Sequence, residues 1–212
     1  MAGILKVDRV QSDSNLAFNI AGSNVAFMDA TSLQMVGSNI SVAGTTVISN
    51  GKVVASGMPT GAVLQVKSVY KQDTFTSTSS SYVDVTGLSV SITPTSATSN
   101  ILVLGAVTYG AAADVGFMRL VRNSTAIQVG IGASNRLSAT AQMRNNPDSA
   151  DADSAAISFL DSPSSTSAVT YKVQIASAPG GYTTRINSSA DDVDQTNRGR
   201  TASTLIVMEI AG

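Results

Sequence analysis

The sequence predicts an all-β protein, and three observations support this fold class. Apolar and polar residues alternate in several runs, most clearly from Val169 to Ile175, and a period of two is typical of a strand with one buried face. Charged residues make up only 13% of the 212 residues, against about 25% in an average domain. Serine, threonine, valine, asparagine and glycine are abundant instead, and these residues favour strands and turns over helices.

The chain is expected to divide near residue 58. Gly57, Pro59 and Gly61 fall within five residues, a composition typical of a hinge or linker. We therefore predict a β-rich stalk or anchor over residues 1–57, a hinge over residues 58–61 and a head domain over residues 62–212.

Short repeated segments characterise the first region. Gly22–Val25 returns as Gly37–Ile40, 15 residues later. Asn50-Gly51 lies between two apolar runs, which is a strong signal for a type I′ hairpin. These features predict strands of about four to six residues joined by tight turns.

Such short strands bury little apolar area, so the first region needs partners. An intertwined homotrimer would supply them by burying apolar side chains around one axis, with Leu16, Phe18 and Phe27 as trimer contacts. The alternative is a small sheet that docks on the second domain of its own chain.

The head is expected to contain eight to ten strands. They are predicted at residues 62–66, 74–76, 82–92, 101–104, 117–121, 127–131, 157–160, 169–175 and 205–210. Long loops around residues 132–153 and 188–202 complete a pattern that fits a jelly-roll β-sandwich.

Two of these segments carry further information. Val83 and Val85 differ in parity from Leu88 and Val90, so one extra residue at Thr86-Gly87, a β-bulge, is expected to keep both halves facing the core. Residues 101–104 are apolar at every position, as expected for a strand covered on both faces.

Composition also excludes several classes of function. The absence of cysteine and histidine excludes disulfides, thiolate and imidazole catalysis, and the usual zinc sites. A formal charge of −1 provides no basic field for nucleic acid, and the longest apolar run is too short to span a bilayer. The first residues lack a signal-peptide pattern, so folding in the cytosol is expected, and no cofactor is expected.

Several segments resemble known virion proteins. Met1–Asp8, followed by Gln11–Asp13, resembles the start of small fibre proteins of tailed bacteriophages. Later segments resemble the C-terminal domain of such proteins, which is similar to the trimeric jelly-roll heads of the C1q and tumour-necrosis-factor type: Tyr82–Leu88, Leu160–Pro163, Thr170–Val173 and Val207–Ile210. The resemblance implies a homotrimer, assembled in the host cytoplasm, whose head faces outward. Its N-terminal part would attach to the tail, neck or capsid of the virion.

Two acidic clusters are candidate sites. Asp148, Asp151 and Asp153 could hold Ca²⁺ through carboxylate oxygens, or they could form a solvated acidic loop. The second cluster consists of Asp191, Asp192 and Asp194, followed by Arg198 and Arg200. Its alternatives are metal binding, sugar hydrolysis by a carboxylate pair, an ordinary surface loop, and charge pairs with a neighbouring subunit.

Two further groups are candidate contacts. Arg119 and Arg122 have opposite parity on a strand, so either one faces inward or both lie near an edge. They are candidate trimer contacts, and the alternative is an edge charge that discourages aggregation. Tyr182 follows Gly180 and Gly181 in a turn, and these three residues are the candidate receptor contact, with an ordinary hairpin turn as the alternative.

These expectations favour a non-enzymatic fibre protein whose three heads bind a host glycan or protein multivalently. One alternative is a decoration or cement protein that stabilises a capsid shell. A second alternative is a glycan depolymerase that uses pairs of aspartates. No catalytic, cofactor-binding or metal-binding residue is assigned.

Overall fold

The computed structural model describes residues 16–20, 23–28, 33–35, 39–42, 45–49, 52–111, 115–144 and 150–212. Contacts divide the chain into two compact units, Met1–Met58 and Pro59–Gly212. The fold is all β, as the sequence predicts, and the only helical segment in the described ranges is the three-residue 3-10 turn η1 (Ala55–Gly57). No helix in these ranges is long and apolar enough to cross a membrane.

The first unit contains two antiparallel three-stranded sheets. One is formed by β1 (Leu16–Ile20), β2 (Ser23–Met28) and β3 (Leu33–Met35). The other is formed by β4 (Asn39–Val42), β5 (Thr45–Ser49) and β6 (Lys52–Val53). Strands β5 and β6 pair through Ser49 and Lys52, so the hairpin predicted across residues 50–51 is present.

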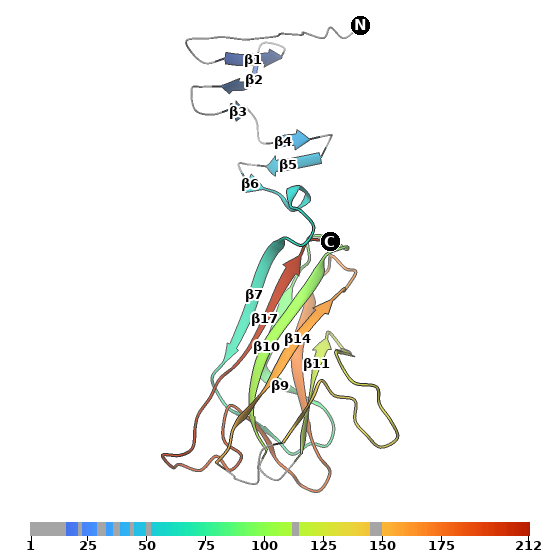
Figure 1. The fold of residues 1–212 in the computed structure, drawn as a ribbon, viewed down its shortest axis with the longest axis vertical. Coiled ribbons are helices and arrows are strands. Elements are labelled where there is room, and N and C mark those ends of the chain that lie inside the picture. The colour runs from blue at the N-terminus through green and yellow to red at the C-terminus, as the bar shows by residue number, and fades with distance from the viewer. Residues whose placement is uncertain are drawn as a thin grey trace. The chain divides into compact units, whose positions relative to one another are not determined.

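The second unit contains two antiparallel sheets (Figure 1). The first sheet has four long strands in the order β7-β17-β10-β14, and β16 and β8 extend it at the far end of β10. The bounds of its strands are β7 (Val63–Lys71), β8 (Phe75–Ser77), β10 (Asn100–Gly110), β14 (Asp153–Asp161), β16 (Thr184–Ile186) and β17 (Ser203–Ile210).

The second sheet has the order β9-β15-β11, with β12 and β13 on the free edge of β11. Because β12 and β13 both pair antiparallel to β11, they act as two pieces of one strand interrupted by residues 128–140. The bounds are β9 (Val83–Ile92), β11 (Gly116–Arg122), β12 (Thr125–Ile127), β13 (Ala141–Met143) and β15 (Val169–Ser177).

This strand order is that of a jelly roll. With the eight main strands numbered along the chain, one sheet runs 1-8-3-6 and the other 2-7-4-5, which corresponds to two interlocked Greek keys. Inward-facing side chains of the two sheets, such as Leu88, Val103, Leu120 and Leu205, are fully buried between them. Each sheet therefore has one face in the core and one outer face.

An irregularity lies at the predicted position of the bulge, but it contains three extra residues and not the single one expected. Asp84 pairs with Gln174 but Ser89 pairs with Lys172, so residues 85–88 of β9 lie opposite the single residue Val173. Gly87 adopts φ +82°, which favours glycine because it has no Cβ. The odd number of extra residues reverses the parity of the strand, so Val85 and Leu88 are both buried.

One strand prediction is wrong, and two short strands were not predicted. The segment predicted at 127–131 is a strand only up to Ile127, because Gln128 adopts φ +53° and Ile131 is fully exposed. Strands β13 and β16, of three residues each, were not predicted.

Candidate interaction surfaces

The outer face of the first sheet carries large apolar side chains beside small polar ones such as Ser68 and Ser158. One row of cross-strand neighbours joins Val66, Met208, Leu102 and Leu160 across all four strands. We call the large apolar side chains that point outward from this sheet the apolar face: Val66, Tyr70, Leu102, Leu104, Leu160, Ile206 and Met208. An antiparallel sheet in contact with water usually has polar residues on its outer face, so this face differs from the ordinary pattern.

Much of the apolar face is exposed. Val66, Tyr70 and Leu160 are 52%, 64% and 56% exposed, while Leu102 is half-buried and its inward neighbour Val103 is fully buried. Residues 101–104 were predicted to be covered on both faces. Within this chain the prediction is wrong, because only the inward face is covered.

The outer face of the second sheet is polar. Lys172 forms an ion pair with Asp84 at 2.7 Å, and Gln174 donates to the same carboxylate at 2.6 Å. Arg119 donates to Gln174 at 2.7 Å, and its guanidinium lies 3.9 Å from the centre of the Tyr82 ring. Hydrogen bonds from Lys172 and Gln174 lower the pKa of the Asp84 carboxyl. This sheet face is therefore adapted to water, whereas the apolar face is not.

A buried ionic cluster joins the two sheets. Arg122 of β11 donates from Nη1 to both carboxylate oxygens of Asp161, at 2.8 and 3.0 Å, and the Tyr171 hydroxyl donates to Asp161 at 2.6 Å. The side chain of Asp161 is 7% exposed and that of Arg122 is 27% exposed. Burial raises the pKa of the Tyr171 hydroxyl, and the hydrogen bond to Asp161 raises it further. Because Asp161 ends β14, this cluster ties the first sheet to the second.

The two candidate arginines thus face in different directions, as their parity predicts. Arg122 reaches the Asp161 carboxylate between the sheets, and Arg119 lies on the outer face of the second sheet. Both have partners in their own chain, and their role as trimer contacts stays a prediction. The side chains of Leu16, Phe18 and Phe27 lie outside what the structure describes, although their strands β1 and β2 pair.

The candidate receptor turn joins β15 to β16. Gly180 and Gly181 adopt φ +124° and +86°, conformations that favour glycine. A Cβ on Gly180 would lie 3.1 Å from the Tyr182 ring, so the missing side chain lets the ring pack closely over the turn. Tyr182 is 41% exposed, as a contact residue must be.

A cleft of about 570 Å³ begins beside this turn. Phe117 and Gln142, which are cross-strand neighbours on β11 and β13, line it together with Ala178 and Pro179 of the turn. Residues 135–137 of the segment between β12 and β13, with Ser80 and Val115, complete the lining.

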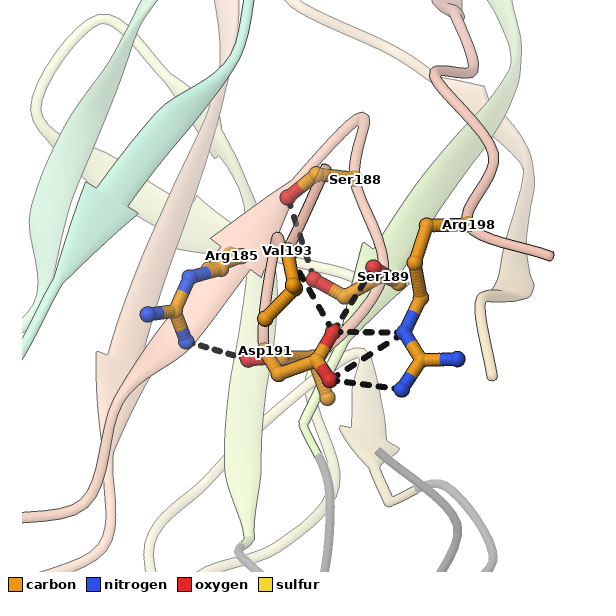
Figure 2. A network of polar contacts seen from close by, with 7 residues as sticks. Arg185, Ser188, Ser189, Asp191, Val193 and Arg198 are labelled. Atoms are coloured by element: carbon orange, nitrogen blue, oxygen red, sulfur yellow. Dashed lines mark hydrogen bonds and ion pairs between the residues drawn. The ribbon is translucent and has the colours of Figure 1, made fainter. Parts of the chain in front are cut away.

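The loop at residues 187–202 is held by internal ion pairs. Arg198 donates from Nε and Nη2 to the Asp191 carboxylate at 2.8–3.1 Å, and the Ser189 hydroxyl and the Val193 amide donate to the same carboxylate (Figure 2). The Arg185 guanidinium donates to the carbonyl of Ala190. These contacts favour the interpretation of this acidic cluster as a structural loop.

The remaining acidic residues do not form a recognisable centre. Asp192 pairs with Arg200 of its own chain at 3.1 Å, and Asp194 is exposed. In the part of the chain that the structure describes, no three acidic side chains are grouped so that they could hold a metal ion. Asp148 lies outside the described residues, so the Ca²⁺ alternative for the first cluster stays a prediction.

Sequence reasoning missed the apolar face and the cleft. The signal for the apolar face is present, because Leu102, Leu104, Ile206 and Met208 are apolar at positions that face away from the core. The cleft has no comparable signal, since its residues come from segments that only the fold brings together.

Comparison with known proteins gives only distant likenesses. No protein-family model matches the chain, and no curated protein matches it. Among solved structures, infectious bursal disease virus of the Gx strain gives a TM-score of 0.36 at 11% identity, covering 87% of this chain and 48% of that chain. The T13 particle of the same virus gives 0.35 at 10% identity, covering 87% and 43%. Its VP2 subviral particle gives 0.34 at 11% identity, covering 88% and 47%.

The chain therefore spans less than half the length of these viral chains. At such TM-scores the likeness carries no argument about this protein. The jelly-roll assignment stands on the strand order and register alone.

Proposed function

We propose that this protein is a non-enzymatic structural protein of a bacteriophage virion, a homotrimeric fibre. Residues 1–57 attach it to the particle, and the head at residues 62–212 faces outward for recognition of the host surface. The fibre assignment comes from the segments that resemble fibre proteins of tailed bacteriophages.

The apolar face is the observation that carries the proposal. Exposed apolar patches of this kind mark surfaces that bind another macromolecule. The outer face of the second sheet, by contrast, carries charged and polar side chains, as expected for a sheet face in contact with water. The occupant that we propose is the same face of two further copies around a three-fold axis, because the large side chains of the apolar face are all uncharged and can pack beside the equivalent side chains of other copies without charge repulsion. Three heads around one axis then bind a surface multivalently.

The assembly is tested by placing one charge on the apolar face. Leu102→Asp puts a carboxylate on the apolar face near the start of β10, where an assembled trimer would exclude water, and we expect it to reduce the particle mass to that of a monomer. Ser89→Asp is the matched control, because Ser89 is exposed on the outer face of the second sheet opposite Lys172. Light scattering measures both masses. Unchanged assembly of the Leu102→Asp variant would contradict the proposal.

The position on the virion needs a separate experiment. A labelled protein imaged on intact particles is expected at the tail, with the label on the head lying away from the particle. A label spread evenly over the capsid would instead indicate a decoration protein. In that case, deleting residues 1–57 would abolish shell binding and the thermal protection of the shell.

A further inference from the structure

We propose that the cleft beside the 179–182 turn binds a carboxylate-bearing sugar of a host surface polysaccharide. This inference rests on the proposed attachment function and names the ligand class that the head would recognise. Three properties of the cleft support it: its rigid walls, its mixed lining and its charge.

The walls of the cleft are held by backbone hydrogen bonds. The Ala178 amide donates to the Val115 carbonyl, and the Ser177 amide donates to the Ser79 carbonyl, both at 2.7 Å. A side chain makes a third such contact, because the Tyr82 hydroxyl donates at 2.8 Å to the carbonyl of Ser138, which follows the lining residue Leu137. A site fixed in this way loses little entropy when it binds a ligand.

The lining of the cleft combines apolar and polar side chains. Phe117, Leu137 and Pro179 supply apolar surface suited to the C–H face of a pyranose ring. The side-chain amides of Asn135 and Gln142 can each donate and accept hydrogen bonds, which suits sugar hydroxyls. A volume of about 570 Å³ accommodates a short oligosaccharide.

The charge of the lining selects among sugars. Among the described residues that line the cleft, Arg136 is the single charged one, and none of them is an aspartate or a glutamate. A guanidinium binds a carboxylate through two parallel hydrogen bonds, so an acidic sugar fits this site better than a neutral one.

The cleft also lies at a suitable end of the head. Strand β10 begins at Asn100, whose partner is Ile210, and ends at Gly110. Strand β11 follows from Gly116, so the pair of Gly116 and Ser177 lies at the other end of the sandwich from Ile210. The Gly61 amide donates to the Ala211 carbonyl at 2.8 Å, so the chain enters the head at the end opposite the cleft. A ligand can therefore approach the cleft from the far end.

The test is a calorimetric titration of the full-length protein with glucuronic acid oligosaccharides and with their carboxyl-reduced counterparts. We expect the wild-type protein to bind the acidic form at least tenfold more tightly. Arg136→Gln should lose about tenfold in affinity for the acidic form and should no longer distinguish the two forms. Lys67→Gln removes one exposed charge from a different sheet and should leave both affinities within about twofold of wild type.

Three outcomes would overturn this inference: no binding of the acidic form at millimolar concentration, equal binding of both forms, or an unchanged affinity in the Arg136→Gln variant. Tighter binding of an acidic peptide than of the acidic sugar would also overturn it. The mass of the same samples separates this inference from the proposed function. A trimer that binds no acidic sugar refutes the inference alone, while a monomer that binds it refutes the proposed assembly.

Discussion

The ionic cluster at Asp161 predicts a large loss of stability when its charge is removed. Asp161→Asn keeps the size of the side chain but removes the charge that accepts two hydrogen bonds from Arg122 and one from Tyr171. A hydrogen bond to a charged group contributes about 1.5–3 kcal/mol, and removing one partner of a buried ion pair costs about 3–5 kcal/mol. Because Arg122 is 27% exposed and is partly hydrated without its partner, we expect a loss of about 2–4 kcal/mol.

The assay is urea denaturation followed by circular dichroism at one protein concentration, because assembly makes apparent stability depend on concentration. A loss of this size would lower Tm by about 5–15 °C in a domain of this length. Tyr171→Phe leaves the ion pair intact and should cost less, about 1–2 kcal/mol. The control is Asp194→Asn, which removes a carboxylate from an exposed loop and should stay within about 0.5 kcal/mol of wild type.

The reasoning about the cluster would be refuted if Asp161→Asn were as stable as the Asp194→Asn control. It would also be refuted if Tyr171→Phe were the more destabilising of the two cluster variants. The first result would mean that the ionic cluster makes no measurable contribution to stability, and the second would mean that the charge of Asp161 is not its main contribution.

Two further predictions concern stability. Burial alone would raise the pKa of Glu209, but hydrogen bonds from Gln65 at 2.6 Å and from the amide and hydroxyl of Thr95 at 2.6 and 2.7 Å hold it below its ordinary value of 4.5. The carboxylate therefore stabilises the fold above about pH 4.5, and this contribution is lost as the pH falls through the lower folded-state pKa. Glu209→Gln should lower the free energy of unfolding at pH 7 and weaken its fall in acid, and an unchanged pH profile would contradict this. A Cβ on Gly110 would lie 2.5 Å from the Ala190 nitrogen, so Gly110→Ala should lower the free energy of unfolding by about 1–3 kcal/mol in the same urea assay. The control is Gly199→Ala, where the nearest atom to an added Cβ is 3.9 Å away, and it should lower the free energy of unfolding far less.

Alternation of apolar residues was sufficient to place most strands of the head. It also located the bulge at Gly87. The buried positions change parity there, and a strand can keep both halves facing the core only if an odd number of extra residues is inserted. Alternation failed at 127–131 because the backbone at Gln128 turns despite the apolar neighbours. It also missed β13 and β16, since three residues are too few to show a period.

Pairings between distant residues could not be predicted. Arg122 and Asp161 are 39 residues apart, and only the jelly-roll order brings the end of β14 beside β11. The cleft has the same origin, because its residues come from five separate segments. The apolar residues of this face could be recognised in the sequence. Alternation alone could not show whether the residues that cover them come from this chain or from another.

The molecular mass of the wild-type protein in solution tests the central claim most directly. Sedimentation equilibrium over a range of protein concentrations should give three times the chain mass of 21.6 kDa, because the apolar face is expected to be covered by two further copies. A mass of 21.6 kDa at every concentration would contradict the proposal, since the apolar face would then remain in contact with water in a stable monomer.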